Sequence, residues 1–127
     1  MSIIIYTMFT DQIIQQVWEK ATVVEGFDSK NIRKDACGAW ILRSKYGLRD
    51  SEFGWEIDHV YPISLGGDDN FLNLRAMQWE NNVSKGDDYP SYISVVKAEG
   101  NKNIAIEGQY AVNETLKRKL KDLYENK

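Results

Sequence analysis

Residues 55–88 read WEIDHVYPISLGGDDNFLNLRAMQWENNVSKGDD. The first six of them predict a β-strand, bounded by Gly54 and Pro62. The glycine, aspartate and asparagine residues of SLGGDDN, at positions 64–70, are typical of a turn. The apolar residues that follow are spaced as in a helix, which we expect over about residues 73–84.

The only histidine of the chain, His59, follows Asp58 at the end of this predicted strand. Adjacent strand residues point to opposite faces, so the two side chains can share a site only where the strand ends and twists into a loop. A lone histidine is no motif by itself. Further polar residues follow it in a regular frame, with Asn73, then Asn82, then Lys85.

This frame, DH, then GG, then NL, then NxxKGD, resembles the HNH nuclease family, and the match runs from Trp55 to Asp88. The preceding RKDACGAWILRSKYGLRDSEFGWEIDH resembles the flank of small bacterial HNH proteins. The resemblance implies a ββα-metal fold with a motif core at residues 54–88, in which a strand ends in Asp-His and a helix carries the last Asn. Gly66 and Gly67 match the glycines of the intervening loop.

The resemblance also implies a role for each matched residue. Asp58 and Asn82 match the metal ligands, and His59 matches the general base. Asn73 matches the central Asn that holds the active-site loop and orients the histidine. Because Asn81 stands beside Asn82, either of them could be the second metal ligand, and the NxxK spacing favours Asn82.

One departure from the family concerns zinc. Many HNH proteins carry CxxC pairs that bind a structural zinc ion, but Gln78 and Asn81 stand at the corresponding positions here. We therefore expect no structural zinc, and we expect the packing of Trp40, Trp55 and Trp79 to replace it.

Physical chemistry supports the same function for these residue types. Hydrolysis of a phosphodiester needs an activated water, a cation on the phosphate and help for the departing 3′ oxygen. An imidazole is partly neutral at physiological pH and accepts a proton from water. Two protein oxygens, with waters and substrate oxygens, suit Mg²⁺ or Mn²⁺. The chain is thus predicted to be a metal-dependent endonuclease that cuts or nicks DNA. Glu56 and Asp69 could join the metal shell, but exposed or structural roles are favoured for both. Glu56 alternates with Asp58 on the predicted strand, which allows the two side chains to share a face.

The charge of the chain is unevenly distributed. The net charge is −3, but residues 51–90 alone carry −6. Phosphate is repelled by such a segment unless a divalent cation is bound, so the basic flanks are expected to grip the nucleic acid. The candidate phosphate contacts are Lys30, Arg33, Lys34, Arg43, Lys45 and Arg49, with Arg75 and Lys85 closer to the chemistry. An ordinary solvated surface is about equally compatible with these scattered charges.

The 127 residues, 43% of them hydrophobic, predict a single α+β domain over residues 1–127. The remaining predicted elements are a helix over about residues 11–22 that begins at Thr10 or Asp11, a short strand or buried turn at residues 36–42, a hairpin of residues 92–97 and 103–107, and a helix that begins after Asn113. The last helix places Leu116, Leu120 and Leu123 on a core-facing side.

Cys37 cannot form an internal disulfide and is expected to be a buried core residue. The amino-terminal MSIIIYTMFT is too short an apolar run for a signal segment or a membrane span, which predicts a cytoplasmic protein without a membrane partner. Two alternatives stay open, a catalytically inactive HNH-fold module that binds DNA and a toxin or effector nuclease domain with an immunity partner. A homodimer is also open.

Overall fold

The computed structural model describes residues 9–126, so most of the amino-terminal stretch discussed above lies outside the described residues. The helices are α1 (Asp11–Trp18), α2 (Trp79–Lys85) and α3 (Glu114–Tyr124). The strands are β1 (Ile32–Lys34), β2 (Trp40–Leu42), β3 (Trp55–His59), β4 (Leu74–Gln78), β5 (Ser91–Glu99) and β6 (Lys102–Ala111). The strands form three separate antiparallel pairs, β1–β2, β3–β4 and β5–β6. The predicted α+β class is confirmed.

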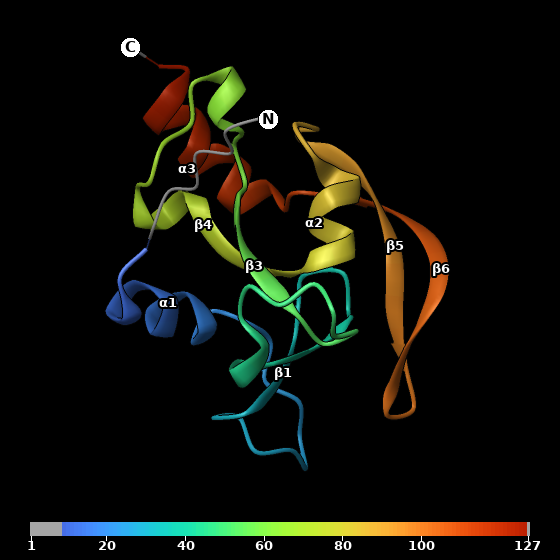
Figure 1. The fold of residues 1–127 in the computed structure, drawn as a ribbon. Helices are drawn as coiled ribbons and strands as arrows, with labels where there is room; N and C mark the ends of the chain where they lie inside the picture. The colour runs from blue at the N-terminus through green and yellow to red at the C-terminus, as the bar shows by residue number, and fades with distance from the viewer. Residues whose placement is uncertain (1–8, 127) are drawn as a thin grey trace, which may run out of the picture.

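The β3–β4 pair lies at the centre of the molecule, and α2 follows β4 without a break (Figure 1). In the antiparallel register Asp58 is opposite Arg75 and His59 is opposite Leu74. The chain therefore runs strand, loop, strand, helix through the motif segment. This succession places the end of β3 beside α2, where the candidate residues gather.

The helix predicted over residues 73–84 is wrong in its first half, because Leu74–Gln78 is strand β4 and the helix begins only at Trp79. The apolar spacing is ambiguous here because both faces of β4 are covered. Leu74 belongs to one hydrophobic core and Met77 to the other. A strand buried on both faces shows no alternation, so its apolar residues resemble a helical pattern.

The first core lies between α1 and one face of the β3–β4 pair. Ile14, Val17 and Trp18 of α1 pack there against Trp55 and Ile57 of β3. The rings of Trp18 and Trp55 lie 5.3 Å apart, centroid to centroid. This packing holds the face of β3 on which His59 lies.

The start of α1 is predicted correctly, but its end is not. The Thr10 side chain accepts a hydrogen bond from the Ile13 N–H, as expected of an N-cap. The helix ends at Trp18 rather than near residue 22, because Thr22 forms a β-bridge with Lys34. Strand β1 was not predicted, and the strand expected over residues 36–42 covers only β2.

The second core lies on the opposite face, beneath α3 and the hairpin of β5 and β6. The hairpin and α3 are confirmed at nearly the predicted positions, with Asn113 as the N-cap of α3. Cys37 is buried in this core as predicted, and burial raises the pKa of its thiol to about 12. Between residues 9 and 126, no helix is long and apolar enough to cross a membrane.

Gln78 and Asn81, which stand where the resemblance would place zinc-binding cysteines, form a buried network of hydrogen bonds with Asp35. We call this network the polar hub (Asp35, Gln78 and Asn81). The Asp35 carboxylate accepts from the Gln78 N–H at 2.9 Å and from the Asn81 amide at 3.2 Å. It also accepts from the N–H groups of Cys37 and Ala39, at 2.9 and 2.8 Å. Burial raises the pKa of the Asp35 carboxyl, whereas these hydrogen bonds oppose that change.

Asn81 ties the polar hub to β5, since its side-chain oxygen accepts from the Val95 and Val96 N–H groups at 2.8 and 3.0 Å. The hub thus joins the β1–β2 turn, the start of α2 and β5. The tryptophan prediction needs correction, because Trp40, Trp55 and Trp79 lie in three different places rather than in one cluster that takes the place of zinc. Trp55 lies in the first core, and the other two donate their indole N–H groups to the carbonyls of Gly100 and Ser51.

Candidate active site

A pocket of about 340 Å³ opens where β3 ends beside α2. Its polar lining includes Arg49, Asp58, His59 and Asn82. The apolar side chains of Ile63 and Val83, both largely exposed, also line it. The structure therefore brings three of the four predicted catalytic residues to one pocket, and it places Asn82 there rather than Asn81.

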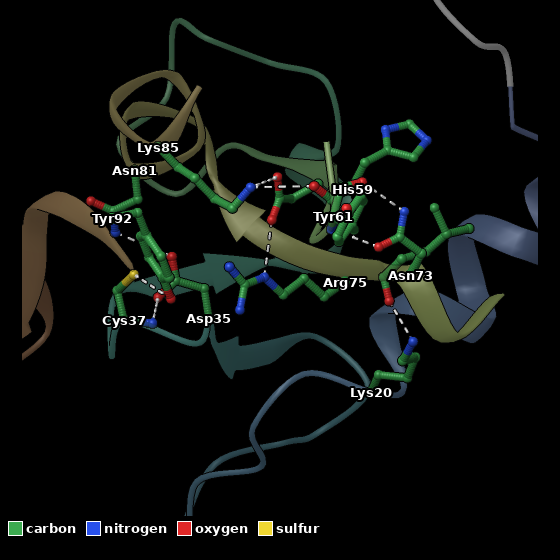
Figure 2. Close-up of polar contacts among 12 residues, drawn as sticks. Lys20, Asp35, Cys37, His59, Tyr61, Asn73, Arg75, Asn81, Lys85 and Tyr92 are labelled. Atoms are coloured by element: carbon green, nitrogen blue, oxygen red, sulfur yellow. Dashed lines mark hydrogen bonds and ion pairs between the residues drawn. The ribbon is translucent and has the colours of Figure 1, made fainter. Parts of the chain in front are cut away.

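The Asp58 side chain points from β3 toward the second core and is almost fully buried. Its carboxylate accepts from Arg75 Nε at 3.0 Å and lies 3.4 Å from Lys85 Nζ. The Arg75 and Lys85 side chains thus both reach this carboxylate. Figure 2 shows the His59 ring pointing away from Arg75 and Lys85. Two cations therefore balance the Asp58 charge inside the protein.

This arrangement corrects the prediction that Lys85 and Arg75 contact phosphate. Lys85 is 1% exposed, and its ammonium lies between Asp58 and the His59 carbonyl, which accepts from it at 3.3 Å. Burial lowers the pKa of Lys85, and the nearby Asp58 charge opposes that change. The Arg75 guanidinium is also largely covered and lies over the Tyr92 ring. Both cations serve the interior rather than the surface.

Asn82 contacts a second carboxylate, because its Nδ2 donates to Glu56 Oε1 at 3.0 Å. Arg49 completes this group through two hydrogen bonds to Glu56, at 2.7 and 3.0 Å. The Arg49 side chain is 53% exposed and lines the pocket. Glu56, interpreted from the sequence as exposed or structural, is thus a direct neighbour of a predicted metal ligand. Its alternation with Asp58 along β3 was the one available signal.

His59 lies on the other face of β3, beside the first core. Its Nε2 is 2.7 Å from Oδ1 of Asp69, and its ring centroid lies 6.1 Å from that of Phe9. Asp69 comes from the GGDDN turn, ten residues further along the chain. Sequence reasoning did not find this pair, because no spacing rule relates a strand-end histidine to an acid in the following loop.

Asn73 is completely buried and clasps the loop between β3 and β4. Its amide oxygen accepts from the Tyr61 N–H at 2.7 Å, and its Nδ2 donates to the carbonyls of Tyr61 and Asp68, both at 3.0 Å. Gly67 lets the chain pass close by, since a Cβ there would lie 1.9 Å from the Tyr61 carbonyl oxygen. These contacts hold the loop, while none of them reaches His59 directly.

The other predicted phosphate contacts lie away from the pocket, and Arg49 alone of the predicted basic set lines it. Arg33 donates to three backbone carbonyls, those of Ser29, Glu19 and Ala21. Lys34 lies over the Trp40 ring, and Arg43 donates to Gln15. Arg33 of β1 thus has a structural role, because it holds the loop after α1.

The donor atoms around the pocket suit a hard divalent cation, because Asp58 and Asn82 both offer oxygen. The Asn82 amide oxygen accepts no hydrogen bond from residues 9–126, so it is available to a cation. Asp58 has to share its carboxylate with Lys85 and Arg75. Within the described part of the chain, no group of three or more His, Cys, Asp or Glu side chains gathers.

Residues 48–91 match the family model described as HNH endonuclease. The match confirms the family that the sequence motif predicts, and it includes the five polar residues of the pocket, of which Asp87 is the fifth. Over residues 48–91 the chain is thus similar to HNH endonucleases, a family whose substrate is nucleic acid. No curated protein and no solved structure matches the chain. A homodimer or an immunity partner finds no support in these comparisons.

Proposed function

We propose that the protein is a metal-dependent endonuclease that hydrolyses DNA phosphodiester bonds, with His59 as the general base. One observation supports this most strongly. Asp58 and His59 leave β3 on opposite faces, yet both line one pocket together with Asn82. In-line displacement at phosphorus needs the attacking water and the leaving oxygen on opposite sides. A phosphate over this end of β3 would have His59 on one side and Asp58 on the other.

His59 accepts a proton from the attacking water as the new P–O bond forms and the bond to the 3′ oxygen breaks. The departing 3′ oxygen takes a proton from solvent. Asn73 keeps the loop beyond His59 in place through its three hydrogen bonds. The imidazole is thus held at the mouth of the pocket by the chain on both sides.

Asp58 and Asn82 are the residues that would hold Mg²⁺ or Mn²⁺. Such an ion, when bound, stabilises the charge that develops on the phosphate and on the leaving oxygen. Glu56 keeps the Asn82 side chain in place by accepting from its Nδ2, which turns the amide oxygen away from Glu56. Lys85 and Arg75 hold the Asp58 carboxylate in its orientation beside the pocket.

Arg49 is the residue best placed to bind a backbone phosphate, because it is exposed at the pocket and its guanidinium is oriented by Glu56. An arginine pre-oriented by a carboxylate loses less conformational freedom when it binds a phosphate. The negative charge of residues 51–90 makes this contact and the cation mutually supportive.

The test is a nicking assay on supercoiled plasmid with purified protein in Mg²⁺, in Mn²⁺ and in EDTA. We expect nicking in either metal, none in EDTA, and a loss of about 100-fold or more in His59→Ala. Glu107→Ala, which removes an exposed acid of β6 remote from the pocket, is the matched control and should nick like wild type. Single-stranded DNA and RNA in parallel reactions define the substrate. Intact substrates in every metal would refute the proposal.

A catalytically inactive DNA-binding module is the second candidate, and one observation favours it. Both oxygens of the Asp58 carboxylate are engaged by cations of the protein, which compete with a metal ion. An inactive module would bind DNA equally well as wild type and as His59→Ala, with no cleavage by either. Metal-dependent cleavage that His59→Ala abolishes excludes this candidate.

A further inference from the structure

The contact between His59 and Asp69 has a defined direction. An ionised carboxylate oxygen only accepts hydrogen bonds, so at 2.7 Å the His59 Nε2 must carry the hydrogen. The neutral ring then keeps its lone pair on Nδ1. A base whose tautomer is set by a neighbouring acceptor presents one defined nitrogen to water.

The Asp69 side chain is 50% exposed. Asp68, the residue before it, is held by several hydrogen bonds. The Asp68 carbonyl accepts from Asn73, and its carboxylate accepts from the Asn70 N–H at 3.0 Å. The Tyr124 hydroxyl of α3 donates to the same carboxylate at 2.5 Å. The loop position of Asp69 is therefore set by contacts to three other residues through Asp68.

Tyr124 contacts both ends of the Asn73 clasp. Its ring stacks on Tyr61 with centroids 5.0 Å apart, while its hydroxyl reaches Asp68. Asn73 itself joins Tyr61 to Asp68. α3 lies beyond the segment that matches the family model, which ends at residue 91, so this support is supplied by the chain outside the matched motif.

We infer that Asp69 is a positioning residue, which fixes the orientation and tautomer of His59 so that Nδ1 is the basic nitrogen. Tyr124 is the second positioning residue, since it holds the loop that carries Asp69. The catalytic part of this inference rests on the proposed nuclease function. The contact itself does not, so the two are tested separately.

The first test is nuclear magnetic resonance of ¹⁵N-labelled histidine, which is unambiguous because the chain holds only His59. At a pH where the ring is neutral, wild type should show a single tautomer with the hydrogen on Nε2 and an observable Nε2–H resonance. Asp69→Ala should lose that resonance and shift both ring nitrogens. Identical spectra for the two proteins would overturn the inference, whether or not the protein cuts DNA.

The second test separates kcat from KM in the nicking reaction. Asp69→Ala should lower kcat about 10-fold or more, with KM changed by less than about 2-fold, because the ring stays present but loses its orientation. Asp69→Asn should recover part of the loss, since its exposed amide can turn its oxygen to His59. A kcat equal to wild type in Asp69→Ala would overturn the catalytic part alone.

Tyr124→Phe removes one hydroxyl and keeps the ring that stacks on Tyr61. We expect kcat to fall about 3-fold, together with a broadened Nε2–H resonance. Tyr89→Phe is the matched control, because Tyr89 also packs on Tyr61 but its hydroxyl has no hydrogen-bond partner among the described residues. Equal behaviour of the two variants would show that Tyr124 supports the fold only and would overturn its role.

Discussion

Asn81 and Asn82 are neighbours on α2, but Asn81 belongs to the polar hub and Asn82 lines the pocket. In the polar hub, both ends of the Asn81 amide are engaged, by Asp35 and by the backbone of β5. At the pocket, the Asn82 side chain contacts the described part of the chain through its Nδ2 alone, toward Glu56. A buried amide with every partner satisfied is a structural element, whereas an amide with spare capacity beside a pocket is available to a ligand.

The same difference separates the two buried carboxylates. Within residues 9–126, Asp35 is balanced by four N–H donors and by no cation. Asp58 is balanced by two cations and borders solvent at the pocket. Three of the four donors to Asp35 are backbone N–H groups, which the fold keeps in place, while charged side chains can be rearranged. The comparison thus predicts that Asp35 serves the fold and that Asp58 serves both the fold and the chemistry.

The largest expected effect is that of Asp58→Asn. It leaves Lys85 and Arg75 buried without their counter-charge, so we expect a loss of about 3–5 kcal/mol in unfolding free energy, together with loss of cleavage. Adding Lys85→Met should recover part of the stability and none of the activity. Chemical denaturation followed by tryptophan fluorescence measures the stability. If the double variant were no more stable than Asp58→Asn, the ion pair would have no structural role.

Asp35→Asn should destabilise the fold by about 3 kcal/mol, because an amide cannot accept from all four donors and sets its own N–H₂ against one of them. Below its melting temperature the variant should still cut DNA, since the polar hub lies outside the pocket. Thermal unfolding and the nicking assay check the two parts. A folded Asp35→Asn protein without activity would show that the hub and the pocket are coupled.

Asn82→Ala and Asn81→Ala sharpen the comparison most directly. We expect Asn82→Ala to lose about 100-fold in kcat with little change in melting temperature, because it removes the oxygen that we propose to bind the metal from a half-exposed site. Asn81→Ala should lower the melting temperature by several degrees and keep its activity per folded molecule. Isothermal titration with Mn²⁺ should show weakened binding in Asn82→Ala alone. The opposite pattern would reassign the ligand to Asn81.

The smallest effect concerns Cys37 at alkaline pH. Its pKa is about 12 in the folded protein, above the 9.0 of an unburied thiol, so the unfolded state releases the proton first. The thiol therefore lowers stability as pH rises from about 9 toward 12, and not below that range. Cys37→Ala should flatten the fall in melting temperature over this interval. At pH 8 the native thiol should also react with a disulfide reagent only on unfolding.

Local chemistry made much of the fold predictable. Thr10 and Asn113 cap their helices, and the leucines of α3 face the core at the predicted spacing. The hairpin of β5 and β6 has its turn where glycine and asparagine predict one. Strand β4 was missed because its apolar residues serve two cores at once, which no single periodicity describes.

The site was only partly predictable for a related reason. The spacing of the motif placed Asp58, His59 and Asn82 correctly in one pocket. It did not show that Lys85 and Arg75 would be buried. The sequence near a motif does not distinguish a basic residue at the surface from one in a buried ion pair. The tryptophans were likewise expected to act together, whereas the tertiary structure separates them.

The sequence by itself indicated the HNH motif, the α+β class and the residues proposed to activate water and to bind a cation, because these depend on residue type and on separation along the chain. Only the tertiary structure showed which partner each residue takes: Asp69 for His59, Glu56 for Asn82, and Lys85 with Arg75 for Asp58. Such partners come from other strands and loops. Their choice depends on how the chain packs, which no local pattern encodes.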